Sequence, residues 1–325
     1  MRSLLGVLSV LALASCTTDA APESDAMAAK VVRLEVPLGT NGAIDVLFVI
    51  DNSAAMAGLQ ETLASSYRTL IDTIVTTSYG EAPDLHVAVI TTDSAALREQ
   101  RYLSDIPQFG WQRLRNYSGT LPDNFVQLAS VGAAGGPARP LDVLRASLTS
   151  PTSAGFLREH AALAIVVVTS GDDQSTASVA EVAASVRQLK ADPARIFVGA
   201  ALACAPDASP RLRAFLEQFP GRAADVAICA ADLRPIVAPI ADQLKVTLGA
   251  PCITTPLAEP RACSAVLVDP ASAQQLALPA CSDAVTTHCY AVREDAAACP
   301  TPPYLMVKTS RTLFPATMIL ECVAP

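Results

Sequence analysis

The sequence predicts an α/β fold, with a doubly wound, mostly parallel sheet followed by a small C-terminal β module rich in disulfides. Two observations carry this prediction. Between residues 42 and 248, short aliphatic runs alternate with stretches of helix formers, the pattern of parallel strands joined by helices. Residues 249–325 instead combine prolines and cysteines with short strand-like pieces, and have too little apolar sequence to fold without disulfide bridges.

Residues 44–50 form the predicted central strand, on which the other elements assemble. They read Ile-Asp-Val-Leu-Phe-Val-Ile, apolar except for Asp45, as in a strand that is covered on both faces. The strand stops at a polar turn that contains Asp51 and Ser53, and helix formers follow. A strand, a polar turn and a helix in this order place both side chains at the carboxyl edge of the sheet, where ligands bind in open α/β sheets.

The remaining elements follow in alternation. Further strands are expected at residues 85–93, 163–169, 195–202 and 226–229, and helices at residues 56–74, 141–148, 177–190, 210–219 and 233–248. Residues 94–137 show no clear periodicity, and we interpret them as a covering insertion or a functional loop. His86 lies near the start of its strand, away from the ligand edge, which favours a structural role.

The N-terminus predicts export and a lipid anchor. Arg2 precedes an apolar run over residues 4–13, which is too short to span a membrane. The sequence Leu13-Ala14-Ser15-Cys16 matches a bacterial lipobox in which Cys16 becomes the lipidated first residue; the alternative is a plain signal peptide with an incidental cysteine. Thr17 after the cysteine favours the outer membrane. Residues 17–41 are interpreted as a flexible tether, in which only residues 31–36 suit an edge strand.

The cysteines agree with an exported protein. Of nine cysteines, Cys16 is assigned to the lipid, which leaves an even number of disulfide candidates. These candidates are Cys204, Cys229, Cys252, Cys263, Cys281, Cys289, Cys299 and Cys322. None has the paired spacing of a zinc site.

One pairing follows from the predicted strands. Cys204 and Cys229 each lie at or just past the end of a strand, and these strands are expected to be parallel neighbours about 4.8 Å apart. A disulfide needs Cα atoms about 4.4 to 6.8 Å apart, so the two cysteines are predicted to pair. The alternative is a bridge from either one into the terminal module.

Composition excludes some classes of partner. The formal charge of −8 argues against nucleic-acid binding, which needs a basic surface. It also disfavours an anionic membrane surface, so contact with the membrane is expected only through the lipid. With 51% hydrophobic residues in 325, a substantial core is available.

Several motifs together resemble the von Willebrand factor A domains of Gram-negative lipoproteins, over about residues 42–248. These motifs are the lipobox, Val-Leu-Phe-Val-Ile-Asp-Asn-Ser, His-Val-Ala-Val-Ile-Thr-Thr-Asp, and Gly-Phe-Leu-Arg before an aliphatic strand that leads into Asp-Asp. The resemblance implies a site for Mg²⁺ or a similar hard cation, built from oxygen ligands on three loops.

The residues depart from the family's metal-site pattern. Asp51 and Ser53 match the first loop, but Ala55 replaces its second hydroxyl. The second loop, residues 132–139, has no threonine, and in the third loop Ser170 stands where the family has a carboxylate. Asp172 is expected either to lean in as a substitute ligand or, with its neighbour Asp173, to cap the next helix. The resemblance therefore implies a degenerate metal site.

Two functions remain open at this level. The first is an adhesion-type module that holds a protein or a cell-surface polymer at the loop edge. The second is a metal-free structural protein of the envelope whose cysteine-rich module makes the contacts. Catalysis is not expected, because the histidines are isolated in the sequence and there is no Gly-x-Ser-x-Gly elbow.

Overall fold

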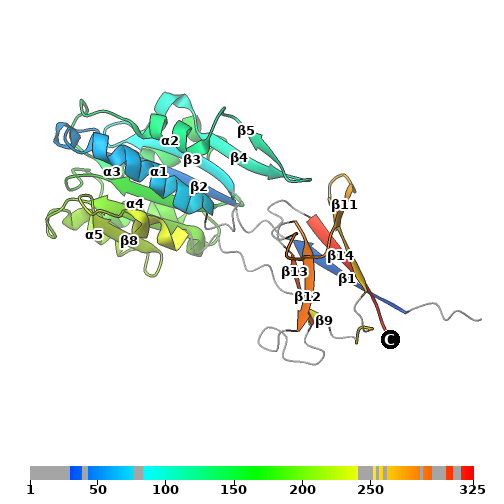
Figure 1. The fold of residues 1–325 in the computed structure, drawn as a ribbon. Helices are drawn as coiled ribbons and strands as arrows, with labels where there is room; N and C mark the ends of the chain where they lie inside the picture. The colour runs from blue at the N-terminus through cyan, green and yellow to red at the C-terminus, as the bar shows by residue number, and fades with distance from the viewer. Residues whose placement is uncertain are drawn as a thin grey trace, which may run out of the picture.

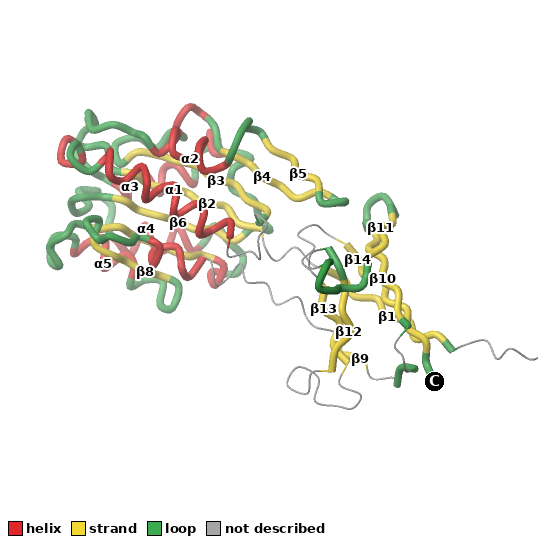
Figure 2. The backbone as a smooth tube through the Cα atoms, in the orientation of Figure 1, coloured by secondary structure: helices red, strands yellow, loops and turns green. Residues whose placement is uncertain are grey.

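The computed structural model describes residues 30–38, 43–76, 83–240, 252–253, 256–258, 262–285, 288–294, 305–309 and 316–325. They form an α/β domain and a β module, drawn in Figures 1 and 2. The predicted signal peptide, Cys16, most of the predicted tether and Cys299 lie outside these residues. None of the helices in the described ranges is long and apolar enough to cross a membrane.

The α/β domain is built on a seven-stranded sheet in the order β5-β4-β3-β2-β6-β7-β8. Its strands are β2 (Ala43–Ile50), β3 (Asp84–Thr91), β4 (Leu103–Gln108), β5 (Gln112–Arg115), β6 (Ala162–Val168), β7 (Ile196–Leu202) and β8 (Ala223–Ala227). Five of these strands are parallel, whereas β4 and β5 are antiparallel and extend one side. The predicted mostly parallel sheet is confirmed.

Helices cover both faces of this sheet. The described helices are α1 (Gln60–Thr76), α2 (Leu121–Ala129), α3 (Pro140–Leu148), α4 (Val179–Arg187) and α5 (Pro210–Leu216), with short 3-10 turns that include η1 (Ala54–Met56) and η5 (Arg234–Val237). One apolar core joins α1, α2 and η5 to the sheet, and a second joins α3, α4 and α5 to the other face. Buried residues of β2 contribute to both cores in alternation, as the aliphatic run predicts.

The interpretation of residues 94–137 as an insertion without regular structure is wrong. They contain β4, β5 and α2. The two strands are short and carry Asp105 and Pro107, so they lack an apolar alternation. Tertiary contacts stabilise them instead, because β4 pairs with β3 and with β5.

The β module contains a four-stranded sheet in the order β1-β14-β10-β11, formed by β1 (Val31–Leu38), β14 (Ala316–Val323), β10 (Cys263–Val268) and β11 (Gln275–Leu278). A smaller sheet has the order β12-β13-β9, with β12 (Tyr290–Glu294), β13 (Leu305–Thr309) and β9 (Cys252–Ile253). Strand β1 comes before the α/β domain in sequence and lies at the edge of the first sheet. The α/β domain is therefore inserted into the β module after its first strand.

This pairing changes the predicted domain boundaries. The predicted tether runs to residue 41, yet residues 31–38 pair with β14 over eight register positions. The expectation of an edge strand within residues 31–36 is confirmed. Its partner, near the C-terminus, could not be anticipated from local sequence.

Candidate functional site

Asp51 lies directly after β2, where the chain order of the sheet reverses. Strand β2 has β3 on one side and β6 on the other, so its carboxyl end is the switch point at which open α/β sheets bind ligands. The Asp51 carboxylate is 1% exposed. It accepts hydrogen bonds from the Ser53 amide (2.8 Å), the Thr92 hydroxyl (3.3 Å) and the Thr169 hydroxyl (2.9 Å). All three donors are neutral, and they come from three different loops.

Asn52 ties two further loops to the same point. Its side-chain amide donates to Asp93 Oδ1 (3.0 Å), and its backbone carbonyl accepts from the Gly135 amide (2.7 Å). A Cβ atom at Gly135 would lie 2.4 Å from side-chain atoms of Asn52, so this close approach requires glycine. The Gly136 amide donates to Asp93 Oδ2 (3.1 Å). Residues 132–139 are thus brought to the edge, as the resemblance implies.

The pKa of Asp93 reflects this setting. Burial raises the pKa of the carboxyl group, but hydrogen bonds from Thr91, Gly136 and Asn52 outweigh burial and hold it below its usual value. The Asp93 carboxylate therefore joins its own loop to those of Asn52 and Gly136 through hydrogen bonds.

The Asp172 side chain contacts the start of α5. Its carboxylate accepts from the backbone amides of Arg211 (3.2 Å) and Leu212 (3.3 Å), at the first turn of α5. Its neighbour Asp173 accepts from the Leu141 amide (3.2 Å), at the first turn of α3, and pairs with the Arg211 guanidinium. Both acids serve helix starts, where negative charge is favourable. The capping alternative describes them better than the ligand alternative, although the helices are α5 and α3 and not the next one, α4.

The side chains that remain fit a divalent cation poorly. Mg²⁺ needs near-ideal octahedral oxygen coordination, and of the two predicted carboxylate ligands, Asp51 and Asp172, Asp172 is engaged by the backbone amides at the start of α5. Both of its oxygens already accept hydrogen bonds, and Ala55 offers no side-chain oxygen. The Ser170 hydroxyl, where the family has a carboxylate, is buried and has no hydrogen-bond partner in the described part of the chain. Across the same residues, no group of three or more His, Cys, Asp or Glu is arranged to hold a metal.

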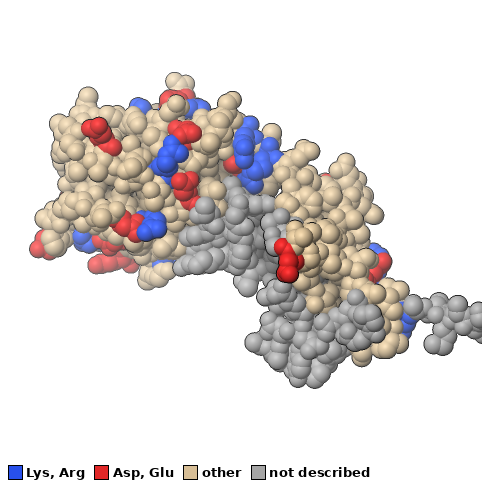
Figure 3. All heavy atoms as spheres, in the orientation of Figure 1, with Lys and Arg blue, Asp and Glu red and all other residues tan. Residues whose placement is uncertain are grey.

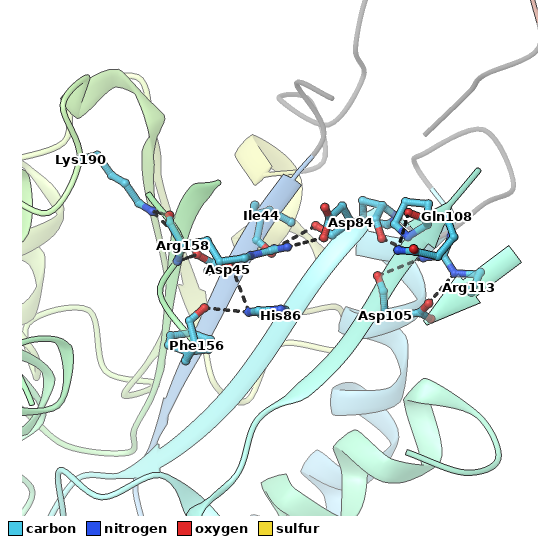
Figure 4. Close-up of polar contacts among 12 residues, drawn as sticks. Ile44, Asp45, Asp84, His86, Asp105, Gln108, Arg113, Phe156, Arg158 and Lys190 are labelled. Carbon is cyan, nitrogen blue, oxygen red and sulfur yellow. Dashed lines mark hydrogen bonds and ion pairs between the residues drawn. The ribbon is translucent and has the colours of Figure 1, made fainter. Parts of the chain in front are cut away.

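A second polar cluster, which we call the amino-edge cluster, lies at the opposite edge of the sheet (Figure 4). It consists of Asp45, Asp84, His86, Arg158 and Lys190. Asp45, fully buried, accepts from the backbone amide (2.6 Å) and Nε (2.8 Å) of Arg158. The guanidinium also pairs with Asp84, and Lys190 Nζ lies 3.8 Å from Asp45 Oδ2. This cluster gives the Gly-Phe-Leu-Arg motif its physical role, because Arg158 neutralises the one charge within β2.

Burial dominates the pKa values in the amino-edge cluster. It raises the pKa of Asp45 and lowers the pKa of Lys190, while the opposite charges of the ion pairs counteract both shifts. Burial also lowers the pKa of His86. The His86 Nδ1 atom lies 2.9 Å from the Phe156 carbonyl oxygen, so the neutral ring donates a hydrogen bond there. This contact agrees with the predicted structural role of His86.

The described disulfides include the predicted one. Cys204 pairs with Cys229, with Cα atoms 5.8 Å apart, at the ends of the parallel neighbours β7 and β8. In the β module Cys263 pairs with Cys322 and Cys281 with Cys289. These bridges close segments of the module that supply a small apolar core.

The comparisons with known proteins give structural neighbours of low similarity. No family model matches the sequence, and no curated protein matches it. Among solved structures, a von Willebrand factor type A protein from Catenulispora acidiphila is 11% identical, with a TM-score of 0.38, over 91% of this chain and 66% of that chain. Proximal thread matrix protein 1 from the mussel byssus, with a zinc-occupied MIDAS motif, is 15% identical (TM-score 0.38; 66% of this chain, 48% of that chain). The pilus adhesin SpaC from Lactobacillus rhamnosus GG is 11% identical (TM-score 0.38; 90% and 41%).

Sequence reasoning missed the residues that hold the carboxyl edge together. No role for Thr92 and Asp93 follows from the sequence patterns, and the resemblance places Thr169 only as the residue before Ser170 in the third loop, yet all three supply or organise the contacts around Asp51 and Asn52. A usable signal exists: each follows an aliphatic run, and the carboxyl ends of neighbouring parallel strands meet at one edge. For the amino-edge cluster, the signal in the sequence is Asp45, the single charged residue within an apolar strand, because a buried charge needs a partner.

Proposed function

We propose that this chain is a cell-envelope protein whose α/β domain is a binding module of the von Willebrand A type. The carboxyl edge of its sheet holds a protein or cell-surface polymer, without chemistry on the bound partner. One observation carries the proposal: loops after β2, β3 and β6, together with residues 132–139, are fastened to one another through Asp51 and Asn52. Rigid scaffolds that present cross-linked loops at a sheet edge are suited to recognition.

Exposure on this edge supports the same function. Ala54 and Ala55, which follow the buried Asp51 in sequence, are exposed, and Gly136 and Arg139 are exposed on the second loop. The exposed groups are small side chains, backbone and one guanidinium, on a framework that is fixed below them. A partner that binds here meets a surface that needs little ordering, which lowers the entropic cost of association.

Catalysis is a weaker reading of the site. His86 lies at the start of β3, on the amino-edge side of the sheet, His160 precedes β6 on that side, and His288 belongs to the β module. None of these rings is therefore placed to activate a hydroxyl near Asp51 as a general base, which requires hydrogen-bond reach.

A second candidate is a metal-free scaffold in which the β module makes the contacts. The observation that favours it is the insertion of the α/β domain between β1 and the later strands. Because of this insertion, β1, the strand nearest the N-terminus, belongs to the same sheet as β14, β10 and β11 of the module. Figure 3 shows charged side chains interspersed over the visible face of the α/β domain and few of them on the visible face of the module.

Site-specific photocrosslinking in cells tests the two candidates. A photoreactive residue at Ala55 samples the carboxyl edge, one at Ala277 samples β11 of the module, and one at Gln188 is the control on α4. A defined adduct from Ala55 that disappears with Asp51→Ala supports the binding edge. An adduct confined to Ala277 supports the scaffold, and adducts from all three positions, or from none, contradict the binding edge.

The anchor is part of the proposal. The Leu13-Ala14-Ser15-Cys16 sequence supports lipidation of Cys16 and attachment to the outer membrane. Cys16→Ala is expected to leave the chain soluble in the periplasm or as an uncleaved precursor. Mass spectrometry of the mature N-terminus that finds no acyl chains would contradict this.

A further inference from the structure

The β4–β5 hairpin extends past the sheet to which it belongs. Strand β4 pairs with β3 only through residues 103–105, whereas its pairing with β5 continues to Gln108 and Gln112. The three residues at the tip are Phe109, Gly110 and Trp111. Among the described strands, the far half of β4 therefore pairs with β5 alone. In Figures 1 and 2 the hairpin reaches toward the β module near β11.

The tip contacts the β module through its two aromatic side chains. Phe109 and Trp111 pack against the apolar core of the module, which includes Leu267, Leu278 and Tyr290. The ring centroids of Trp111 and His288 are 4.2 Å apart, with an interplanar angle of 46°. Aromatic pairs at such distances attract each other beyond the apolar area they bury.

The base of the hairpin is braced by charge. Asp105, which is 2% exposed, pairs with the guanidinium groups of Arg113 and Arg115 and accepts from the Tyr117 hydroxyl (2.7 Å). Arg113 also donates to the Pro83 carbonyl (3.0 Å), just before β3. One buried carboxylate thus fastens both hairpin strands and the following loop, so the projecting tip is held stiffly.

The backbone at the contact is strained on both sides. Trp111 has a φ of 61° and His288 a φ of 53°, in the left-handed region that bulky side chains rarely adopt. Such conformations persist where the surroundings hold them, and they concentrate at functional contacts. Here the two strained residues are the two whose tilted rings lie against each other.

We propose that the β4–β5 hairpin is a latch between the α/β domain and the β module. The chain passes between these units twice, before β2 and before β9, and the hairpin tip adds a third, noncovalent connection. With the latch closed, the α/β domain has a fixed orientation relative to the module; with it open, the domain turns on its two covalent connections. An interface anchored by two aromatic side chains is small, so the closed state is expected to open readily. This inference does not depend on the proposed function.

Trp111 makes the latch measurable, because it is the only tryptophan in the chain. Replacing His288 by Asn removes the facing ring but keeps a residue that tolerates a left-handed backbone. His288→Asn is expected to shift the tryptophan emission to the red and to raise acrylamide quenching severalfold. The matched control is Leu114→Ser, on the same hairpin but 59% exposed, which is expected to change neither.

Small-angle scattering of the purified chain tests the orientation itself. Trp111→Gly deletes the ring while relieving the left-handed strain, so the hairpin is expected to stay folded, which near-UV circular dichroism of the remaining aromatics checks. The variant is expected to show a larger radius of gyration and a broader distance distribution than the parent chain and Leu114→Ser. Superimposable scattering of Trp111→Gly and the parent chain overturns the latch, whatever the fluorescence of His288→Asn, because the tip then does not hold the units together.

Discussion

Two aspartates of one strand segment show how differently this protein treats buried charge. Asp45, near the start of β2, and Asp51, directly after its end, are 0% and 1% exposed. Asp45 faces the cations Arg158 and Lys190. Asp51 receives only neutral donors, from Ser53, Thr92 and Thr169. Asp45 is thus held by ion pairs at the amino edge, whereas Asp51 is held by hydrogen bonds between loops at the carboxyl edge.

The different partners of Asp45 and Asp51 indicate different roles for the two edges of the sheet. A buried ion pair holds its elements in one arrangement, and loss of one partner leaves an uncompensated charge. A carboxylate held by neutral donors fastens the loops through hydrogen bonds without a countercharge, in a place where loops meet solvent. The amino edge is therefore fixed by buried charge pairs, and the carboxyl edge is the end to which we assign the proposed binding.

The largest effect is expected from Arg158→Leu. It leaves Asp45 buried without its main partner, and removing one member of a buried ion pair costs about 3 to 5 kcal/mol. Urea unfolding of the purified chain measures the loss. The double variant Asp45→Leu/Arg158→Leu is expected to recover much of it, because no unpaired charge remains. A double variant as unstable as Arg158→Leu would show that the side-chain shape of Arg158 matters more than its charge.

At the other edge, Asp51→Ala is expected to have a smaller effect. It removes the acceptor of the Ser53 amide and one acceptor each of the Thr92 and Thr169 hydroxyls, and loss of buried hydrogen bonds of this kind costs about 1 to 3 kcal/mol. Hydrogen exchange at the Ser53 amide is expected to accelerate together with the loss of stability. Asp51→Asn retains one acceptor oxygen, so its stability is expected to lie between that of the parent chain and that of Asp51→Ala. A loss as large as that of Arg158→Leu would erase the distinction between the edges.

The pH dependence of stability sharpens the assignment of the amino edge. Burial lowers the pKa of His86 in the folded protein. The neutral ring's contribution to the free energy of unfolding is therefore fully present above the pKa of His86 in the unfolded chain, about 6.5, and is lost as the pH falls toward its pKa in the folded protein. Within that window, stability is expected to decrease by up to about 1.4 kcal/mol per pH unit. Comparison with His86→Gln isolates this residue, since His160 and His288 are present in both. Equal slopes for the two proteins would contradict the assignment.

The smallest effect is expected from magnesium. Because the donor set around Asp51 fits the ion poorly, millimolar Mg²⁺ is expected to raise the melting temperature little. A ligand at a concentration near its Kd adds only about 0.4 kcal/mol. Ala55→Ser combined with Ser170→Asp is expected to increase this stabilisation clearly. A large shift in the parent chain that Asp51→Ala abolishes would show a working metal site and would favour metal-dependent adhesion.

The parallel strands of the α/β domain were predictable from the sequence to within a few residues. Residues 44–50, 163–169 and 195–202 are aliphatic runs, and β2, β6 and β7 lie there. The Cys204–Cys229 bridge was also predictable, because it requires only that two successive strands be parallel neighbours. Strands β4 and β5 were missed because they carry little apolar periodicity.

What the sequence determined by itself is local: which residues are apolar, where the runs stop, and which polar residue follows each run. The tertiary structure decided the partners. Arg158 meets Asp45 across 113 positions, Asp172 turns to α5, and β1 joins β14 at the other end of the chain. Hydrophobic periodicity describes how apolar residues are spaced within one segment. It holds no information on the distant segment that completes the hydrogen bonds of that segment or neutralises its charge. Those pairings follow from the order of strands in the sheets, which only the folded chain establishes.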